Sequence, residues 1–291
     1  MANLRKKSEI CQRFAIAKWL GIVYNFTMSK INKKQKCKYK VGLALSGGGA
    51  RGFAHLGAMM AFADSGIAFD CVAGTSVGSL FGAVYALGLD LEQVKEFCYT
   101  VKDKDLVTKW LKVGSPSYNI ERLADKLFDG AEFSATQIPF ACVAVDLVTG
   151  SEVVLTSGSL AKACSASCAV PLVFTPVEMD GMVLVDGGVS NNIPADVCRQ
   201  MGAEIVIAVD LNHTRSEGTT STKTIDRMGA VWRVMSSATS YKGQHNSDLV
   251  ITPELRIFKS TTIADVDRMI NEGYRATITQ MDEIKQLLNI K

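Results

Sequence analysis

The sequence predicts an α/β protein with a mostly parallel central sheet, and three observations support this. Short apolar runs of strand length alternate along the chain with longer segments of helical periodicity. These strand-like runs are continuously apolar, which is typical of strands covered by helices on both faces. No internal repeat and no linker rich in Gly, Ser or Pro divides the pattern, so we expect residues 41–291 to form a single domain.

The composition is that of an ordinary globular protein. Of 291 residues, 47% are hydrophobic and 21% are charged, which excludes a disordered or collagen-like chain. The eight cysteines are scattered, and no CxxC or Cys/His run indicates a metal site. Cys71, Cys142 and Cys168 stand among apolar neighbours, so we expect small buried side chains in a reducing, cytoplasmic compartment.

The first 40 residues form a basic tail. They hold eleven Lys and Arg against one acid, a charge of +10, and the whole chain carries +3, so the remainder carries −7. An apolar stretch at 14–28 resembles a secretory signal, but Lys18 interrupts it and no small-residue cleavage motif follows. Two interpretations remain: a segment lying on a membrane surface, or upstream sequence outside a natural product that starts at Met28. The overall charge gives no case for nucleic-acid binding.

From Val41 onward the expected elements can be assigned in order. Strands are predicted at 41–46, 69–73, 140–148, 152–157, 182–186 and 204–212. Helices are predicted between the first two strands, ending at Gly66, then up to Gly88, from Asp90, at 159–168 and at 195–201. Two later helices carry apolar stripes, one with Ile225, Met228, Trp232 and Met235, and the last running from about Ile263 through Val266, Ile270, Tyr274 and Met281. We expect both stripes to cover the sheet, with a lipid-facing surface as the alternative.

A glycine-rich turn follows the first strand. Gly47, Gly49 and Gly52 satisfy GxGxxG, and such a turn offers backbone N–H groups and a helix N-terminus to an anion. A dinucleotide site would also need an acid at the end of the second strand. Asp70 is at about the right distance but precedes that strand. A nucleotide-binding module is therefore kept as the alternative function.

The second strand leads into Gly74-Thr75-Ser76-Val77-Gly78, a GxSxG sequence before a helix. A sharp strand-to-helix turn exposes the serine as a nucleophile, whereas a helix-capping serine is the simpler interpretation. If the first two strands are neighbours, this turn faces the glycine turn. The N–H groups of Gly48, Gly49 and Val77 are then candidate oxyanion-hole donors. Arg51 could add positive charge, brace the loop, or be an ordinary surface arginine.

A third turn, Asp186-Gly187-Gly188, closes the strand at 182–186. An acid there can act as the base for Ser76 or merely hold its own turn together. Of the three histidines, His55 is expected to be a packed helix residue, and His213 could complete a Ser76, Asp186, His213 triad. The pattern alone leaves a dyad and a triad equally supported.

Together these turns resemble the patatin-like phospholipase family over about residues 41–212. The blocks that match, in order, are GGGARG at 47–52 (Gly47, Gly48, Gly49, Ala50, Arg51, Gly52), GTSVG at 74–78 (Gly74, Ser76, Val77, Gly78), ASCAVP at 166–171, and DGG at 186–188 (Asp186, Gly187, Gly188). The resemblance implies a three-layer α/β/α fold and a Ser76/Asp186 dyad without histidine, which leaves His213 as a loop residue. It implies hydrolysis of lipid acyl esters through an acyl-enzyme, without a metal or an organic cofactor.

This hypothesis has several physical consequences. A carboxylate is a weak base in water, so the pKa of Asp186 should be raised by a partly apolar pocket. We assign Ser165, Ser167 and Pro171 to shaping the acyl pocket. The partner is a lipid ester, with peripheral membrane contact through the tail, and a membrane-associated scaffold with an unused site is a further alternative. Chain length, head group, acyl acceptor and oligomeric state stay open.

Overall fold

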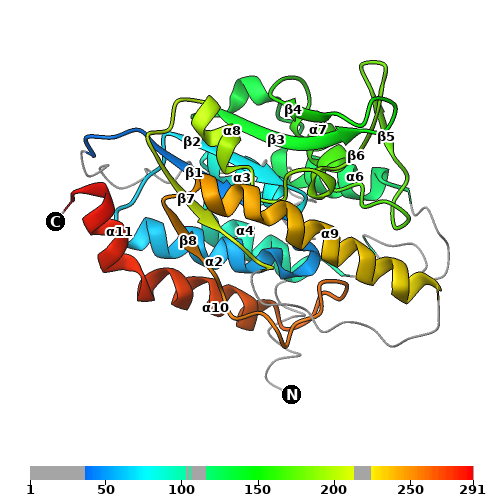
Figure 1. Cartoon of the computed structure of the whole chain (residues 1–291). Coiled ribbons are helices and arrows are strands. Elements are labelled where there is room, and N and C mark those ends of the chain that lie inside the picture. The colour runs from blue at the N-terminus through cyan, green and yellow to red at the C-terminus, as the bar shows by residue number, and fades with distance from the viewer. Residues whose placement is uncertain (1–36, 103–104, 106–115, 213–223, 291) are drawn as a thin grey trace, which may run out of the picture.

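A computed structural model describes residues 37–102, 105, 116–212 and 224–290. The basic tail up to residue 36, including the apolar stretch at 14–28, lies outside these ranges, as does His213. An eight-stranded sheet forms the centre of the molecule (Figure 1). Its strands are β1 (Val41–Leu45), β2 (Cys71–Thr75), β3 (Phe140–Asp146), β4 (Glu152–Leu155), β5 (Val177–Met179), β6 (Met182–Asp186), β7 (Ile205–Val209) and β8 (Leu249–Ile251).

The sheet is mixed, with a parallel part and an antiparallel part. Strands β8, β7, β1, β2 and β3 are neighbours in that order and all run parallel, so the two glycine-marked turns follow adjacent strands as expected. Strands β4 and β6 both pair with β3 in the antiparallel sense, and β5 pairs with β6. Strand β6, which ends at Asp186, therefore runs opposite to β2 and belongs to the antiparallel part of a sheet predicted to be mostly parallel.

The antiparallel direction of β6 is what places its end beside the end of β2. Strand β4 occupies one edge of β3, since it pairs with residues 142–145. Strands β2 and β6 share the other edge, where Thr75 pairs with Val143 and Asp186 pairs with Ala144. The two strands thus approach each other end to end, and the residues at their ends meet at the middle of β3.

Helices cover the sheet on both faces. They are α2 (Phe53–Asp64), α3 (Val77–Leu87), α4 (Leu91–Thr100), α6 (Tyr118–Phe128), α7 (Leu160–Ser167), α8 (Ala195–Gln200), α9 (Thr224–Asn246), α10 (Val266–Thr279) and α11 (Met281–Leu288). Helices α2, α3 and α7 bury the larger core against one face, and α4, α6, α10 and α11 pack outside or beside them. Helix α8 packs a smaller core on the other face, with α9 running beside it (Figure 1). This is the expected three-layer α/β/α arrangement.

Helices α2 and α10 cross at unusually short range. A Cβ on Gly57 would overlap the carbonyl oxygen of Ile270, and a Cβ on Gly273 would overlap that of Ala54. Figure 1 shows the two helices side by side below the sheet. The pair fixes the C-terminal part of the chain against the element that follows the first glycine turn.

The structure differs from the sequence prediction in several elements. Helix α6 and the three-residue strands β5 and β8 were not predicted, and the single last helix is two helices, α10 and α11. The stripe on α9 does not simply cover the sheet: Met235 is 41% exposed, and its neighbours Val231 and Val234 are more exposed still. The side chains that α9 buries include the small polar Ser236 and Ser240. The structure does not describe the side chains of Ile225 and Met228.

Candidate active site

Ser76 occupies the sharp turn between β2 and α3. Its backbone has φ 52° and ψ −129°, a conformation that a residue with a side chain adopts only when the surroundings enforce it. Two close contacts enforce the turn: a Cβ on Gly78 would overlap the Leu45 carbonyl oxygen, and a Cβ on Gly74 would overlap the Gly78 carbonyl oxygen. Ser76 makes no side-chain cap to the helix, so the helix-capping interpretation is wrong. Strain of this kind is typical of functional sites.

Ser167, at the end of α7, holds this turn in place. Its hydroxyl accepts a hydrogen bond from the Ser76 N–H at 2.9 Å and donates one to the Val143 carbonyl at 2.6 Å. Ser165 instead donates to the Ser117 carbonyl at 2.9 Å. Both serines are fully buried, so they brace backbone and do not expose a hydroxyl to a pocket. The sequence signal for Ser167 was a polar residue inside an otherwise apolar block.

Asp186 ends β6 and is buried, with 1% of the residue exposed. Its Oδ1 accepts a hydrogen bond from the Gly188 N–H at 2.8 Å, while its buried Oδ2 has no hydrogen-bond partner. Burial raises the pKa of Asp186 to about 7, against the smaller lowering effects of the Ser76 hydroxyl and the Gly188 N–H. This is the direction expected from the sequence. The Ser76 hydroxyl is thus close enough to lower the pKa of the carboxyl group, although it does not donate a hydrogen bond to the buried Oδ2 in this structure.

Cys168 also adjoins this pair. Burial raises the pKa of its thiol well above the ordinary value, and the neighbouring Asp186 carboxylate raises it further. The hydroxyls of Ser79 and Ser76 oppose the shift more weakly. The thiol therefore stays protonated and serves as an apolar wall beside Asp186. Cys71, Cys142 and Cys168 are all buried free thiols, as predicted.

Two N–H groups of the glycine turn have no acceptor among the residues that the structure describes. The Gly47 N–H donates to the Asn192 carbonyl at 3.1 Å, and the Ala50 N–H donates to the Ser260 carbonyl at 2.8 Å. Within the described ranges, the N–H groups of Gly48 and Gly49 donate to nothing, and Gly49 has a positive φ of 58°. Unpaired donors in a turn that faces a nucleophile are what an oxyanion requires.

Val77 is the first residue of α3, so its N–H has no carbonyl within the helix to bond. Its side chain fills the space over Gly52, where a Cβ would collide with it. The same contact brings the start of α3 against the glycine turn. The N–H of Val77, like those of Gly48 and Gly49, has no acceptor in the part of the chain that the structure describes.

Arg51 is a buried brace and not a surface residue. Its side chain is 8% exposed, and its Nε donates to the Phe258 carbonyl at 2.9 Å. Together with the bond from Ala50 to Ser260, this contact ties the glycine turn to the segment between β8 and α10. Of the three roles considered for Arg51, the structure supports bracing.

The segment after Asp186 joins all three turns, a role that was not predicted from the sequence. The Thr75 hydroxyl donates to the Asn191 carbonyl at 2.8 Å, next to the Ser76 turn. The Asn192 carbonyl accepts from the glycine turn, and its Nδ2 donates to the Ser240 hydroxyl of α9 at 2.9 Å. Asn191 and Asn192 are both buried, and two buried asparagines in an apolar chain are a signal that could have been used. Gly187 and Gly188 give this segment room, because a Cβ on Gly187 would overlap the Val143 carbonyl.

The remaining candidates lie apart from this chemistry. His55 is fully buried in α2, where its Nε2 bonds the Ser46 carbonyl at 2.8 Å and burial lowers its pKa to about 4. It is the packed helix residue that was expected. The Asp70 carboxylate accepts a hydrogen bond of 2.8 Å from the Val41 N–H. Val41 begins β1, whereas the glycine turn follows the other end of that strand. Asp70 is therefore not placed to bind the ribose of a dinucleotide.

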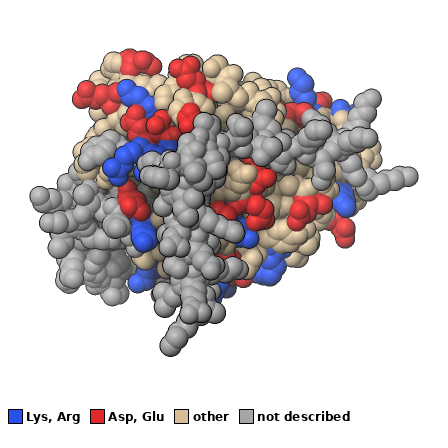
Figure 2. Space-filling view, turned by 180° about the vertical axis from the view of Figure 1, so that it is seen from behind, with Lys and Arg blue, Asp and Glu red and all other residues tan. Residues whose placement is uncertain are grey.

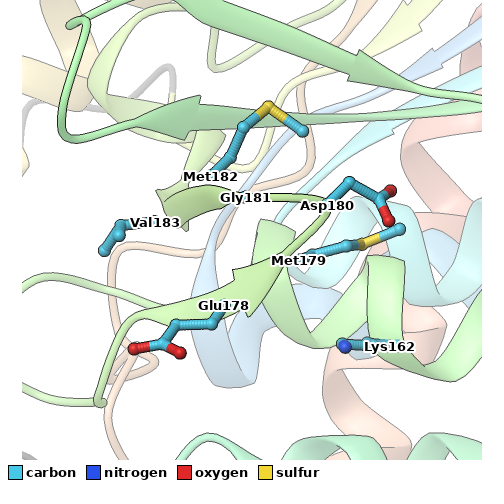
Figure 3. A pocket seen from close by; sticks show the side chains of 7 residues that line it. All are labelled: Lys162, Glu178, Met179, Asp180, Gly181, Met182 and Val183. Atoms are coloured by element: carbon cyan, nitrogen blue, oxygen red, sulfur yellow. The ribbon is translucent and has the colours of Figure 1, made fainter.

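A surface hollow lies elsewhere, at the β5–β6 hairpin. It has a volume of about 390 Å³ and is lined by six hairpin residues and Lys162 of α7 (Figure 3). None of the predicted site residues lines it.

On the face of the molecule opposite to that of Figure 1, acidic and basic side chains lie interspersed over the described surface (Figure 2). Among the described helices, none combines the length and apolarity needed to cross a bilayer.

Comparison with known proteins places the chain in a family. A family model described as patatin-like phospholipase matches residues 43–199. An NTE family protein of Mycobacterium tuberculosis is 34% identical over 179 residues, which cover 60% of this chain and 30% of that protein. A patatin-like phospholipase domain-containing protein of Caenorhabditis elegans is 36% identical over 186 residues, covering 59% of this chain and 13% of that one. The chain therefore spans less than a third of the length of these two relatives.

A solved structure supports the same fold. VipD from Legionella pneumophila superposes with a TM-score of 0.55 and 13% identity, covering 84% of this chain and 67% of that chain. At this identity the likeness concerns the fold alone. Since the family model matches more than half of its residues, the chain belongs to the patatin-like phospholipase family.

Proposed function

We propose that the chain is a serine hydrolase that cleaves fatty-acyl esters of lipids, phospholipids included, through an acyl-enzyme on Ser76. The observation that carries the proposal is the placement of a strained, glycine-flanked serine next to a buried carboxyl group with a raised pKa. A carboxyl group that titrates near neutral pH is a far better base than an ordinary aspartate. The family name supplies the substrate class.

The proposed reaction has two halves. In the first, ionised Asp186 takes the Ser76 proton, the serine oxygen attacks the ester carbonyl carbon, and the alcohol leaves with the proton that Asp186 returns. In the second, Asp186 takes a proton from a water molecule, whose oxygen attacks the acyl carbon. The bond to the Ser76 oxygen then breaks, Asp186 returns the proton to that oxygen, and the fatty acid is released. The N–H groups of Gly48, Gly49 and Val77 hold the negative oxygen of each tetrahedral intermediate. The unpaired Oδ2 of Asp186 is the acceptor atom that this mechanism assigns.

We further propose that residues 41–291 act as one catalytic unit. The segment beyond residue 212 supports this, because the carbonyls of Phe258 and Ser260 hold the glycine turn. A chain ended after residue 212 should then be unable to hydrolyse esters even if its sheet forms. An active truncated chain would contradict this proposal.

Covalent labelling tests the nucleophile directly. A fluorophosphonate ester should label the full chain at Ser76, identified by peptide mass, because only an activated serine reacts quickly. Ser76→Ala and Asp186→Ala should each lower fatty-acid release by at least about a thousandfold. Ser151→Ala, at an exposed serine in the β3–β4 turn, is the control and should keep full activity. Absence of labelling at Ser76 would refute the assignment.

The alternatives give different results in the same assays. A nucleotide-binding module would bind a dinucleotide and be indifferent to Ser76→Ala, and the position of Asp70 counts against it. A membrane-bound scaffold would lose its function on deletion of residues 1–36 while showing no ester turnover. The proposed hydrolase should keep its turnover of a soluble ester after that deletion.

A further inference from the structure

Asn212 follows β7 at the carboxyl end of the sheet, 13 residues beyond the segment matched by the family model. Its side-chain Nδ2 donates a hydrogen bond of 2.6 Å to the Gly47 carbonyl oxygen. The Ser46 hydroxyl also donates to that oxygen, at 3.1 Å. The Gly47 carbonyl is therefore held from two sides, and the shorter bond comes from Asn212.

The direction of this carbonyl decides the direction of the next N–H group. A trans peptide is planar, so the Gly48 N–H points opposite to the Gly47 C=O. The structure has no cis peptide among its described residues. Among the described residues, no protein acceptor holds the Gly48 N–H. Its direction therefore depends on the Gly47 carbonyl, which belongs to the same peptide plane. Holding the carbonyl therefore aims the N–H.

The backbone of Asn212 is itself anchored. Its backbone N–H donates to Oδ1 of Asp210 at 2.9 Å, and Gln244 of α9 donates to Oδ2 of the same carboxylate at 2.9 Å. Asp210 is 1% exposed, and its N–H bonds the Ile251 carbonyl at the end of β8. Hydrogen bonds thus run from α9 and β8 through Asp210 and Asn212 to the glycine turn. A donor group held by such a network keeps its geometry during the reaction.

We propose that Asn212 is the positioning residue of the oxyanion hole, aiming the Gly48 N–H by holding the Gly47 carbonyl. This inference rests on the proposed hydrolase function and adds a residue from beyond the family-matched segment. Asn212 does not touch the substrate, and its effect passes through one peptide group. Its loss should weaken binding of the tetrahedral intermediate while leaving binding of the planar ester unchanged.

Asn212→Asp and Asn212→Ala test the proposal in the full chain. The aspartate has nearly the same shape but cannot donate, and it places a carboxylate oxygen against the Gly47 carbonyl. Loss of a whole oxyanion donor costs about 100- to 1000-fold, so misalignment should lower kcat for a soluble ester about 10- to 100-fold. KM should change by less than about twofold. Asn212→Gln, which keeps an amide donor, should recover part of kcat.

A trifluoromethyl ketone gives the readout that a merely structural effect would not move. It forms a reversible hemiketal with an active serine, and the hemiketal oxygen occupies the oxyanion position. Its inhibition constant should rise by the same factor by which kcat/KM falls across the three variants. The pH profile of kcat/KM should not shift in Asn212→Ala or Asn212→Gln, because neither change adds a charge near Asp186. Asn246→Asp is the matched control, since this amide, at the last residue of α9, also donates to a backbone carbonyl, that of Lys242 at 2.8 Å, and not to the glycine turn.

The outcomes separate the two proposals. Wild-type hydrolysis with labelling at Ser76, together with unchanged kcat and inhibitor binding in Asn212→Asp and Asn212→Ala, would overturn the role of Asn212 alone. A fall in kcat without a matching rise in the inhibition constant would overturn it as well. A wild-type chain that is neither labelled nor active would overturn the proposed function, and this inference with it.

Discussion

Asp186 lies beside Ser76 because β2 and β6 end at adjacent residues on the same edge of β3. Thr75 pairs with Val143 in the parallel sense, and Asp186 pairs with Ala144 in the antiparallel sense. Two residues that are 110 positions apart in the sequence are thus brought together by the backbone register of a single strand. Ser167 fixes the same point from a helix, since it bonds both the Ser76 N–H and the Val143 carbonyl.

The raised pKa of Asp186 predicts an acidic limit to activity. The carboxyl group must be ionised to act as a base, and its pKa is about 7 in the folded chain. We therefore expect kcat/KM to fall about tenfold for each pH unit below 7 and to level off above it. The measurement is a pH series with a soluble ester whose own ionisation does not change. A fall in kcat/KM that begins only near pH 4 would contradict the assignment of Asp186 as the base.

The same shift predicts that Asp186→Asn stabilises the fold at alkaline pH. The folded chain binds the proton more tightly than the unfolded chain, so between about pH 4 and pH 7 ionisation of Asp186 costs stability as the pH rises. Removing the charge should raise the free energy of unfolding at pH 8, by up to a few kcal/mol. At pH 4 the variant should match the wild type. Urea unfolding at both pH values measures this, with Asp180→Asn in the exposed β5–β6 turn as the control.

His55 should give the opposite dependence. Its pKa is lowered to about 4 in the folded chain, so the unfolded chain binds more protons between pH 4 and pH 6.5. The contribution of neutral His55 is complete above pH 6.5 and is lost as the pH falls through 4. In the wild type, the contributions of His55 and Asp186 to the pH dependence of the free energy of unfolding have opposite signs. Compared with the wild type, His55→Gln should therefore lose more of its free energy of unfolding between pH 4 and pH 7, as urea unfolding would show, and a slope like that of the wild type would contradict the burial argument.

Ser167→Ala should damage catalysis more than Ser165→Ala. The first change removes the acceptor of the Ser76 N–H and leaves the Val143 carbonyl without its donor, so kcat should fall about 10- to 100-fold. The second removes a bond to Ser117 only. Each variant loses a buried hydrogen bond and should lose about 1 to 3 kcal/mol of stability. Equal kcat values in the two folded variants would show that Ser167 supports only the fold.

Gly57→Ala should destabilise the chain although it improves helix propensity. In an isolated helix this change would stabilise by about 1 kcal/mol. At the α2–α10 crossing the new methyl group would overlap the Ile270 carbonyl, so we expect a loss of about 2 kcal/mol or more. Ala63→Gly, at an exposed position of α2, is the control and should cost no more than about 1 kcal/mol. A thermal-melting series measures both, and a stabilised Gly57→Ala would contradict the close crossing.

The sequence by itself determined the features that depend on local chemistry. Continuous apolar runs located β1, β3, β6 and β7, because strands covered on both faces need apolar side chains at every position. The GxSxG turn located Ser76 because only glycine fits where Gly74 and Gly78 meet neighbouring backbone. The same kind of constraint marked the glycine turn. The family resemblance also came from such local patterns.

Tertiary structure alone decided how these turns meet. The antiparallel direction of β6, the bracing by Ser167 and the bonds from Asn192, Asn212 and Ser260 all join positions far apart in the chain. Sequence periodicity does not predict such contacts, because each of these residues bonds to a group that is distant in the sequence. The raised pKa of Asp186 has the same origin: an aspartate becomes a base near pH 7 only after the folded core removes the water around it.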